Sequence, residues 1–180
     1  MRFLGLFVAI AAVLPVTGAA AAPVRTQVAS CEEGPIQYGH GVAGWRRRSE
    51  VAGPLGLPSG FLQRMVPTSS GQLVMKAPAT VEGSALVILR VPPRLRHRVS
   101  LYYGRRTDRE GRPTNRVGQG PGFSEVAFHP CAGRPRTVFP GGVRVRGRAP
   151  VRLLVQVDGA STSIPMPLGR PRALEPRRAS

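Results

Sequence analysis

The chain has 180 residues, with 26 lysines and arginines against nine acidic residues, and it contains two cysteines. This length corresponds to about one domain, and the 22 glycines and 19 prolines disfavour a fold built from long helices. The formal net charge of +17 favours anionic partners.

The N-terminal 21 residues have the pattern of a secretory signal peptide. A charged start is followed by an apolar stretch from Phe3 to Val16 and then by small residues. We expect cleavage after Ala21, because this choice keeps Pro23 out of the position directly after the cut. The alternative is an uncleaved anchor, but Pro15 and Gly18 interrupt the stretch, and a membrane span needs about 20 apolar residues. The sequence therefore predicts a secreted protein, extracellular or in the cell envelope, with no membrane span after cleavage.

The remaining chain divides into three predicted parts. We expect a linker over residues 22–30, one β-sandwich domain over residues 31–168 and a basic disordered tail over residues 169–180, because the tail lacks the apolar residues needed to fold. Inside the domain, residues 105–122 carry five arginines and no apolar period, which predicts a long exposed loop.

Short runs of apolar and β-branched residues, separated by glycine and proline, predict a sandwich of seven to eight short strands. The alternation is clearest in the last run, where Val151 and Leu153 point to one face and Arg152 to the other. The run over residues 84–91 is apolar on both faces, so we expect it to be a central strand covered on both sides. The candidate strands are residues 50–52, 72–76, 84–91, 98–103, 123–129, 137–139, 143–146 and 151–157.

The two cysteines are Cys31 and Cys131. Thiols oxidise outside the cytosol, so one disulfide between them is the simplest pairing for an exported chain. In the chain-entropy model, a closed loop of about 100 residues contributes roughly 4.7 kcal/mol of stability.

The glycine-rich run Gly118-Gln119-Gly120-Pro121-Gly122 has the composition of a phosphate-binding loop. Such a loop needs a helix directly after it. Here residues 123–128 have the pattern of a strand, so we interpret the run as a turn.

Several turn motifs resemble those of small secreted β-rich proteins of high-GC bacteria. They are Val91-Pro92-Pro93, Tyr103-Gly104, Phe128-His129-Pro130-Cys131 and Phe139-Pro140-Gly141-Gly142. The resemblance implies an Ig-like antiparallel sandwich and implies no activity.

Residues that would support catalysis do not form a recognisable motif. The histidines are His40, His97 and His129, and none has the spacing of a metal site or of a nucleophile and its base. We therefore expect a non-catalytic protein without a metal or cofactor. The alternative is an extracellular hydrolase whose site is assembled from distant loops.

The arginines are concentrated in the later half of the chain, where residues 90–152 hold 15 arginines and three acidic residues. Alternation places Arg144 and Arg146 on one face, and Arg152 faces outward on the following strand, which predicts a basic ladder across neighbouring strands. Guanidinium groups match carboxylates and phosphates, so the ladder is a candidate anion-binding face. The candidate residues are Arg144, Arg146 and Arg152, with Arg105, Arg106 and Arg109 in the loop.

The expected partner of this face is an anionic cell-envelope polymer or an acidic protein. Nucleic acid is not expected, since no recognition helix or aromatic-basic motif is present. The alternative interpretation is a solvated basic face that reflects the coding bias of a GC-rich genome, because Lys76 is the one lysine.

Overall fold

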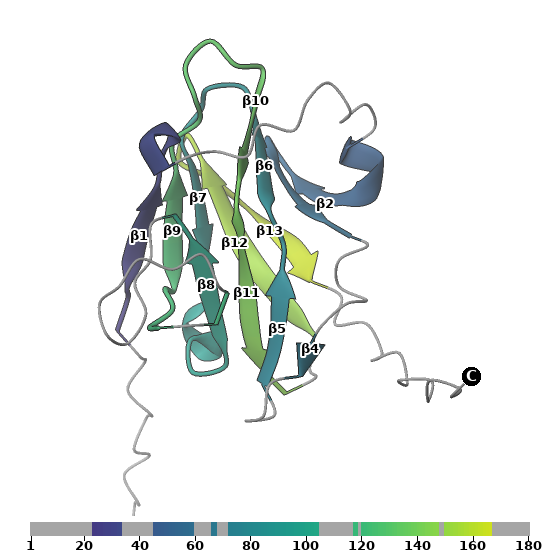
Figure 1. Cartoon of the computed structure of the whole chain (residues 1–180), viewed down its shortest axis with the longest axis vertical. Coiled ribbons are helices and arrows are strands. Elements are labelled where there is room, and N and C mark those ends of the chain that lie inside the picture. Colours follow the sequence, from purple (N-terminus) through teal and green to yellow (C-terminus); the bar gives the residue numbers. More distant parts are fainter. Residues whose placement is uncertain are drawn as a thin grey trace, which may run out of the picture.

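The computed structural model describes residues 23–33, 45–59, 66–67, 72–104, 117–118, 120–147 and 150–166, and these form an all-β sandwich (Figure 1). The fold class predicted from the sequence is confirmed, while the Ig-like strand order stays a prediction. The expected signal peptide and tail lie outside the described residues.

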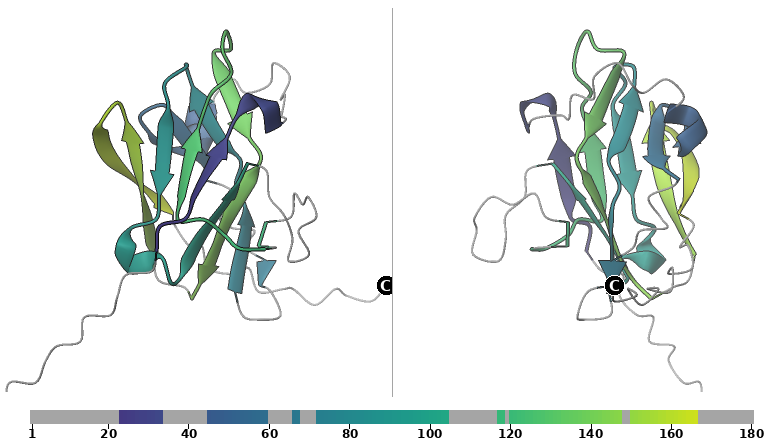
Figure 2. Two further views of the ribbon diagram at one scale, coloured as in Figure 1. Left: turned by 90° about the vertical axis from the view of Figure 1, so that its left-hand side faces the viewer. Right: turned by 45° about the vertical axis from the view of Figure 1, so that its right-hand side comes forward.

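One layer of the sandwich is a five-stranded sheet, here called sheet A. Its strands are antiparallel except for β1, which lies parallel to β9 at one edge (Figure 2). Their order across the sheet is β1 (Thr26–Ala29), β9 (Glu125–Phe128), β7 (Val87–Arg90), β12 (Val151–Val157) and β13 (Ala160–Met166).

The other layer consists of two four-stranded sheets, B and C, which are joined where the chain passes from β10 to β11 and from β5 to β6. Pro140 separates β10 from β11, and Ala77 and Pro78 separate β5 from β6. Proline cannot donate to a β-ladder, so the strands bend at these points, but the Ala77 amide still donates to the Gly141 carbonyl at 3.0 Å. Sheet B has the order β10 (Arg136–Phe139), β6 (Ala79–Glu82), β3 (Leu55–Pro58) and β2 (Ser49–Ala52), and sheet C has the order β4 (Val66–Pro67), β5 (Gln72–Lys76), β11 (Gly141–Arg146) and β8 (Val99–Tyr103).

Alternating apolar side chains from all three sheets meet in one core. Val151, Leu153 and Val155 of β12 are buried, as their period of two predicts. The Phe128 ring lies 5.1 Å from both the Tyr103 ring and the Phe139 ring, measured between centroids. These aromatic contacts join sheet A to the facing layer. Among the described residues, short 3-10 helices lie between strands, namely η1 (Cys31–Glu33), η2 (Trp45–Arg48) and η4 (Pro93–Leu95).

Three expectations about the strands are wrong. The described residues form 13 strands, and β1, β3, β4, β6 and β13 were not predicted. Residues 26–29 of the expected linker form β1, because pairing with β9 supplies the hydrogen bonds that four residues cannot make alone. Residues 87–90 form β7, the central strand of sheet A as expected, but this strand is covered on one side only, since Val87 and Leu89 are buried while Leu86 is 42% exposed.

Candidate functional site

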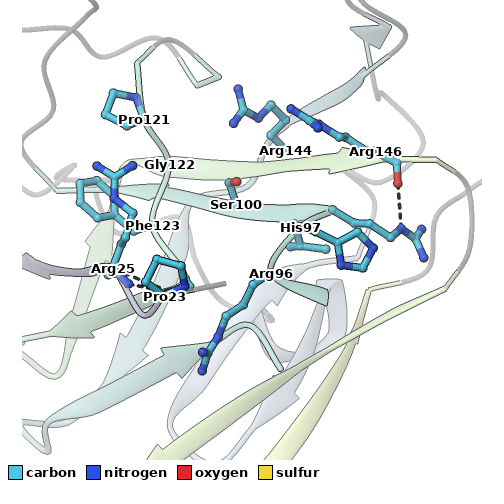
Figure 3. A pocket seen from close by; sticks show the side chains of 13 residues that line it. Pro23, Arg25, Arg96, His97, Ser100, Pro121, Gly122, Phe123, Arg144 and Arg146 are labelled. Atoms are coloured by element: carbon cyan, nitrogen blue, oxygen red, sulfur yellow. Dashed lines mark hydrogen bonds between the residues drawn. The ribbon is translucent and has the colours of Figure 1, made fainter. Parts of the chain in front are cut away.

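A pocket of about 270 Å³ lies where sheet C meets the beginning of β1 and the segment before β9 (Figure 3). Its lining among the described residues is dominated by cationic side chains and contains no carboxylate. The arginines that line it are Arg25, Arg96, Arg98, Arg144 and Arg146.

Strands β8 and β11 place three of these residues on the outer face of sheet C. Val145 pairs with Val99 and both side chains are buried, so the neighbouring residues Arg144 and Arg146 face outward. Ser100 is the register partner of Arg144. The Arg146 amide donates to the Arg98 carbonyl at 2.8 Å, which extends the ladder by one step and places Arg98 beside Arg146.

The segment before β9 crosses this outer face and forms one wall of the pocket. A Cβ atom at Gly122 would lie 2.4 Å from the Ser100 Cβ atom and 2.9 Å from Tyr102 Cζ, so only glycine allows the chain to pass this close to β8. Phe123 then forms a β-bridge with Leu101, and β9 begins two residues later in sheet A. The glycine-rich run therefore precedes a strand, as predicted, and it also contributes Gly122 and Pro121 to the pocket.

Arg25 lies directly before β1 and reaches the pocket on the same side as Phe123 (Figure 3). Its amide donates to Ser124 Oγ at 2.8 Å, and its carbonyl accepts from the Ser124 amide at 2.9 Å. The guanidinium carbon lies 5.7 Å from the centre of the Phe123 ring. These contacts fix the start of β1 against the segment that carries Phe123.

In the described part of the chain, the contacts of Arg98 and Arg144 are made with neutral groups. The Arg144 guanidinium lies 5.2 Å from the Tyr102 ring centre, and Nη1 donates to the Gly118 carbonyl at 3.5 Å. Arg98 Nε donates to the Arg146 carbonyl at 3.0 Å. For Arg25, Arg98, Arg144 and Arg146, the described part of the chain provides no ion pair. Their positive charges are therefore not neutralised there, which is the electrostatic condition for binding an anion.

The structure brings together two of the six arginines predicted from the sequence. Arg144 and Arg146 line the pocket, but Arg152 lies in sheet A, because β12 pairs with β7 and β13 and not with β11. The Arg152 guanidinium donates from Nη2 to Ser163 Oγ at 3.0 Å. The predicted ladder across neighbouring strands is therefore wrong. Arg105, Arg106 and Arg109 lie outside the described residues.

Sequence reasoning missed Arg25, Arg96 and Arg98. The alternation in residues 98–103 already placed Arg98 on the polar face of its strand, so a signal for this residue was present. For Arg25 no signal exists, since it follows from the pairing of β1 with β9. His97 lines the same pocket, His129 is exposed elsewhere, and His40 lies outside the described residues.

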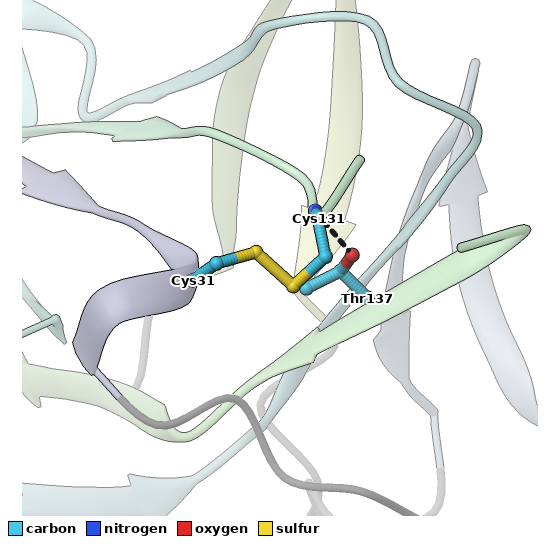
Figure 4. Close-up of a disulfide and its surroundings, with 3 residues drawn as sticks. All are labelled: Cys31, Cys131 and Thr137. Atoms are coloured by element: carbon cyan, nitrogen blue, oxygen red, sulfur yellow. Dashed lines mark hydrogen bonds between the residues drawn. A yellow bond between two sulfur atoms is a disulfide. The ribbon is translucent and has the colours of Figure 1, made fainter. Parts of the chain in front are cut away.

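The predicted disulfide is present between Cys31 and Cys131 (Figure 4). The two Cα atoms are 5.4 Å apart, and the bridge spans a sequence separation of 100 residues. The Cys131 amide donates to Thr137 Oγ1 at 2.8 Å, which fixes the turn after β9. The bridge holds η1, and with it the end of β1, against this turn.

Comparison with protein-family models, with curated proteins and with solved structures finds no match for this chain. Among the described residues, no helix has both the length and the apolar character required to cross a membrane.

Proposed function

We propose that this chain is a secreted, non-catalytic β-sandwich protein that binds an anionic cell-envelope polymer or an acidic partner through the arginine pocket. The observation that carries the proposal is the convergence of five arginines on one pocket whose described lining contains no carboxylate. An anion bound there gains attraction from several guanidinium groups at once and reduces the repulsion between them.

Two further observations support the proposal. The disulfide is typical of proteins that fold outside the cytosol, which agrees with the signal-peptide pattern. The alternative hydrolase predicts a histidine beside a carboxylate in a pocket, whereas His97 lies in a pocket with arginines. A contiguous cationic site is the arrangement expected of a binding protein.

The proposal is tested by cosedimentation of the purified processed protein with isolated cell envelopes. We expect the protein to pellet at low ionic strength and to be released as NaCl rises to about 0.5 M, because salt screens exposed charges. The double variant Arg144→Gln/Arg146→Gln should pellet much less, and the control Arg152→Gln should pellet like the wild type. Pelleting that does not respond to salt, or that is equal in the double variant and the wild type, would contradict the proposal.

A further inference from the structure

The pocket has two sides of different chemistry. Arg144 and Arg146 of β11 and Arg98 at the start of β8 form the cationic side. Pro23, Pro121 and Phe123 form a more apolar side across from them, where the Arg25 guanidinium lies 5.7 Å from the centre of the Phe123 ring. Figure 3 shows the two prolines and Phe123, together with Arg25, grouped apart from Arg144, Arg146 and His97, with Ser100 between the groups.

The cationic side favours an anion that carries more than one charge. Arg144 and Arg146 are neighbours on one face of β11, and Arg98 is hydrogen-bonded to the Arg146 carbonyl. A phosphoryl group carries about 1.5 to 2 negative charges and three acceptor oxygens, whereas a carboxylate carries one charge and two oxygens. Guanidinium forks bind phosphate oxygens in pairs, so a phosphoryl group makes fuller use of these three arginines.

The pocket has room for more than a phosphoryl group. Its volume of about 270 Å³ is far larger than the roughly 30 Å³ that one water molecule occupies in the liquid. The phosphoryl group would fill only the cationic side, and the rest of the space is bounded by Phe123, the two prolines and Arg25, whose guanidinium lies over the Phe123 ring. Such surfaces bind the C–H faces of a sugar ring or polyol, while Ser100 and His97 provide hydrogen-bonding groups for its hydroxyls.

We propose that the pocket binds a phosphoryl group attached to a sugar or polyol, with the phosphoryl oxygens on Arg98, Arg144 and Arg146 and the carbon skeleton against Phe123. This inference rests on the proposed function, since it specifies the anion that the arginine pocket recognises. The same chemistry is found in phosphorylated envelope polymers and in free sugar phosphates.

The experiment is isothermal titration calorimetry of the purified processed protein at constant ionic strength. The probes are glucose 6-phosphate, inorganic phosphate, glucuronate and glucose. We expect glucose 6-phosphate to bind at least about tenfold more tightly than inorganic phosphate or glucuronate, and glucose not to bind measurably. Arg146→Gln should lower the affinity for glucose 6-phosphate and the affinity for inorganic phosphate alike, each by about tenfold. The control Arg152→Gln should change neither affinity.

The variant Phe123→Leu tests the apolar side separately. It keeps the backbone bridge to Leu101 but removes the ring, so the affinity for glucose 6-phosphate should fall more than that for inorganic phosphate. Equal affinities for glucose 6-phosphate and inorganic phosphate would overturn the sugar or polyol part of the inference. Tighter binding of glucuronate than of glucose 6-phosphate would overturn the phosphoryl part. Both results leave the proposed function intact. If none of the anionic probes binds and envelope pelleting is also insensitive to Arg146→Gln, the proposed function itself fails.

A last titration with short poly(glycerol phosphate) distinguishes the two sources. Each phosphodiester of this polymer carries one charge and two free oxygens, so tighter binding of the polymer than of glucose 6-phosphate indicates an envelope polymer whose neighbouring phosphates share the arginines. The reverse indicates a free sugar phosphate or a terminal phosphomonoester. Both results support a phosphoryl group attached to a sugar or polyol. If neither poly(glycerol phosphate) nor glucose 6-phosphate binds, the inference is overturned.

Discussion

Arg98 and Arg146 are joined by two hydrogen bonds that run in opposite directions. The Arg146 amide donates to the Arg98 carbonyl at 2.8 Å, and Arg98 Nε donates to the Arg146 carbonyl at 3.0 Å. The Arg98 side chain is thereby held along the end of β11, while Arg146 is exposed. The Arg98 charge is thus held beside the Arg146 side chain of the neighbouring strand, an arrangement of like charges that water screens and that a bound anion stabilises.

Arg146→Gln should not destabilise the unliganded fold. The side chain is exposed and lies beside two other cationic groups, so its loss removes repulsion. We expect the free energy of unfolding to stay the same or rise by up to about 0.5 kcal/mol at low ionic strength, and the difference to vanish at high salt. Urea denaturation at both salt concentrations measures this, with Arg152→Gln as the control. A clear loss of stability would mean that Arg146 supports the fold.

Removal of the disulfide should destabilise the protein strongly. The bridge closes a loop of 100 residues and restricts the unfolded chain, so the variant Cys31→Ser/Cys131→Ser should lose about 2–5 kcal/mol of unfolding free energy. Urea denaturation of wild type and variant without reductant gives the difference. The mass of the intact wild-type protein is the control, because a bridged chain lacks the two thiol hydrogens. Two free thiols would refute the pairing.

Tyr103→Phe should lower stability through a single buried hydrogen bond. The Tyr103 hydroxyl donates to the Ala77 carbonyl at 2.7 Å, at the bend between β5 and β6. Without the hydroxyl this carbonyl loses a partner, so we expect a loss of about 1–3 kcal/mol in the free energy of unfolding. Anion binding should be unchanged, because Tyr103 points into the core and away from the pocket. Wild-type stability in the variant would show that this bond contributes little.

Gly122→Ala should disturb both folding and the pocket. The added methyl group would come within 2.4 Å of the Ser100 Cβ atom, so the segment that carries Pro121 and Phe123 must move away from β8. We expect a loss of about 1–3 kcal/mol of stability together with weaker binding of glucose 6-phosphate.

The matched control for this substitution is Gly133→Ala. Gly133 has a positive φ of 70°, and a Cβ atom there meets nothing within 4 Å. Its replacement strains the backbone by about 1 kcal/mol but should leave binding unchanged. If Gly122→Ala also leaves binding unchanged, the close passage over Ser100 does not shape the pocket.

The sequence identified strands best where apolar residues alternate with polar ones or form a short run between polar residues. Residues 151–157 were predicted with the observed bounds because their side chains alternate between the core and solvent, and residues 72–76 were predicted as an apolar run between Gln72 and Lys76. β3, with the sequence Leu-Gly-Leu-Pro, carries no such period. β1 has only four residues and depends on pairing with β9, about 100 residues later in the chain. Local patterns do not contain such distant partners.

For the pocket too, the sequence predicted what depends on one strand and missed what depends on strand pairing. Alternation within one strand correctly placed Arg144 and Arg146 on the outer face of β11. Alternation could not show that β11 pairs with β8, which brings Arg98 and Ser100 beside these residues. The assumption that β12 lies beside β11 in the same sheet placed Arg152 wrongly, because β12 pairs with β7.

The sequence by itself determined the fold class, the single disulfide and the outward direction of the strand arginines, because these depend on composition, on two available thiols and on the period of a strand. Only the tertiary structure decided which arginines share a pocket and that Phe123 and two prolines face them. Those neighbours come from strand pairing and from a chain that crosses between layers, and both are set by the packing of the whole core.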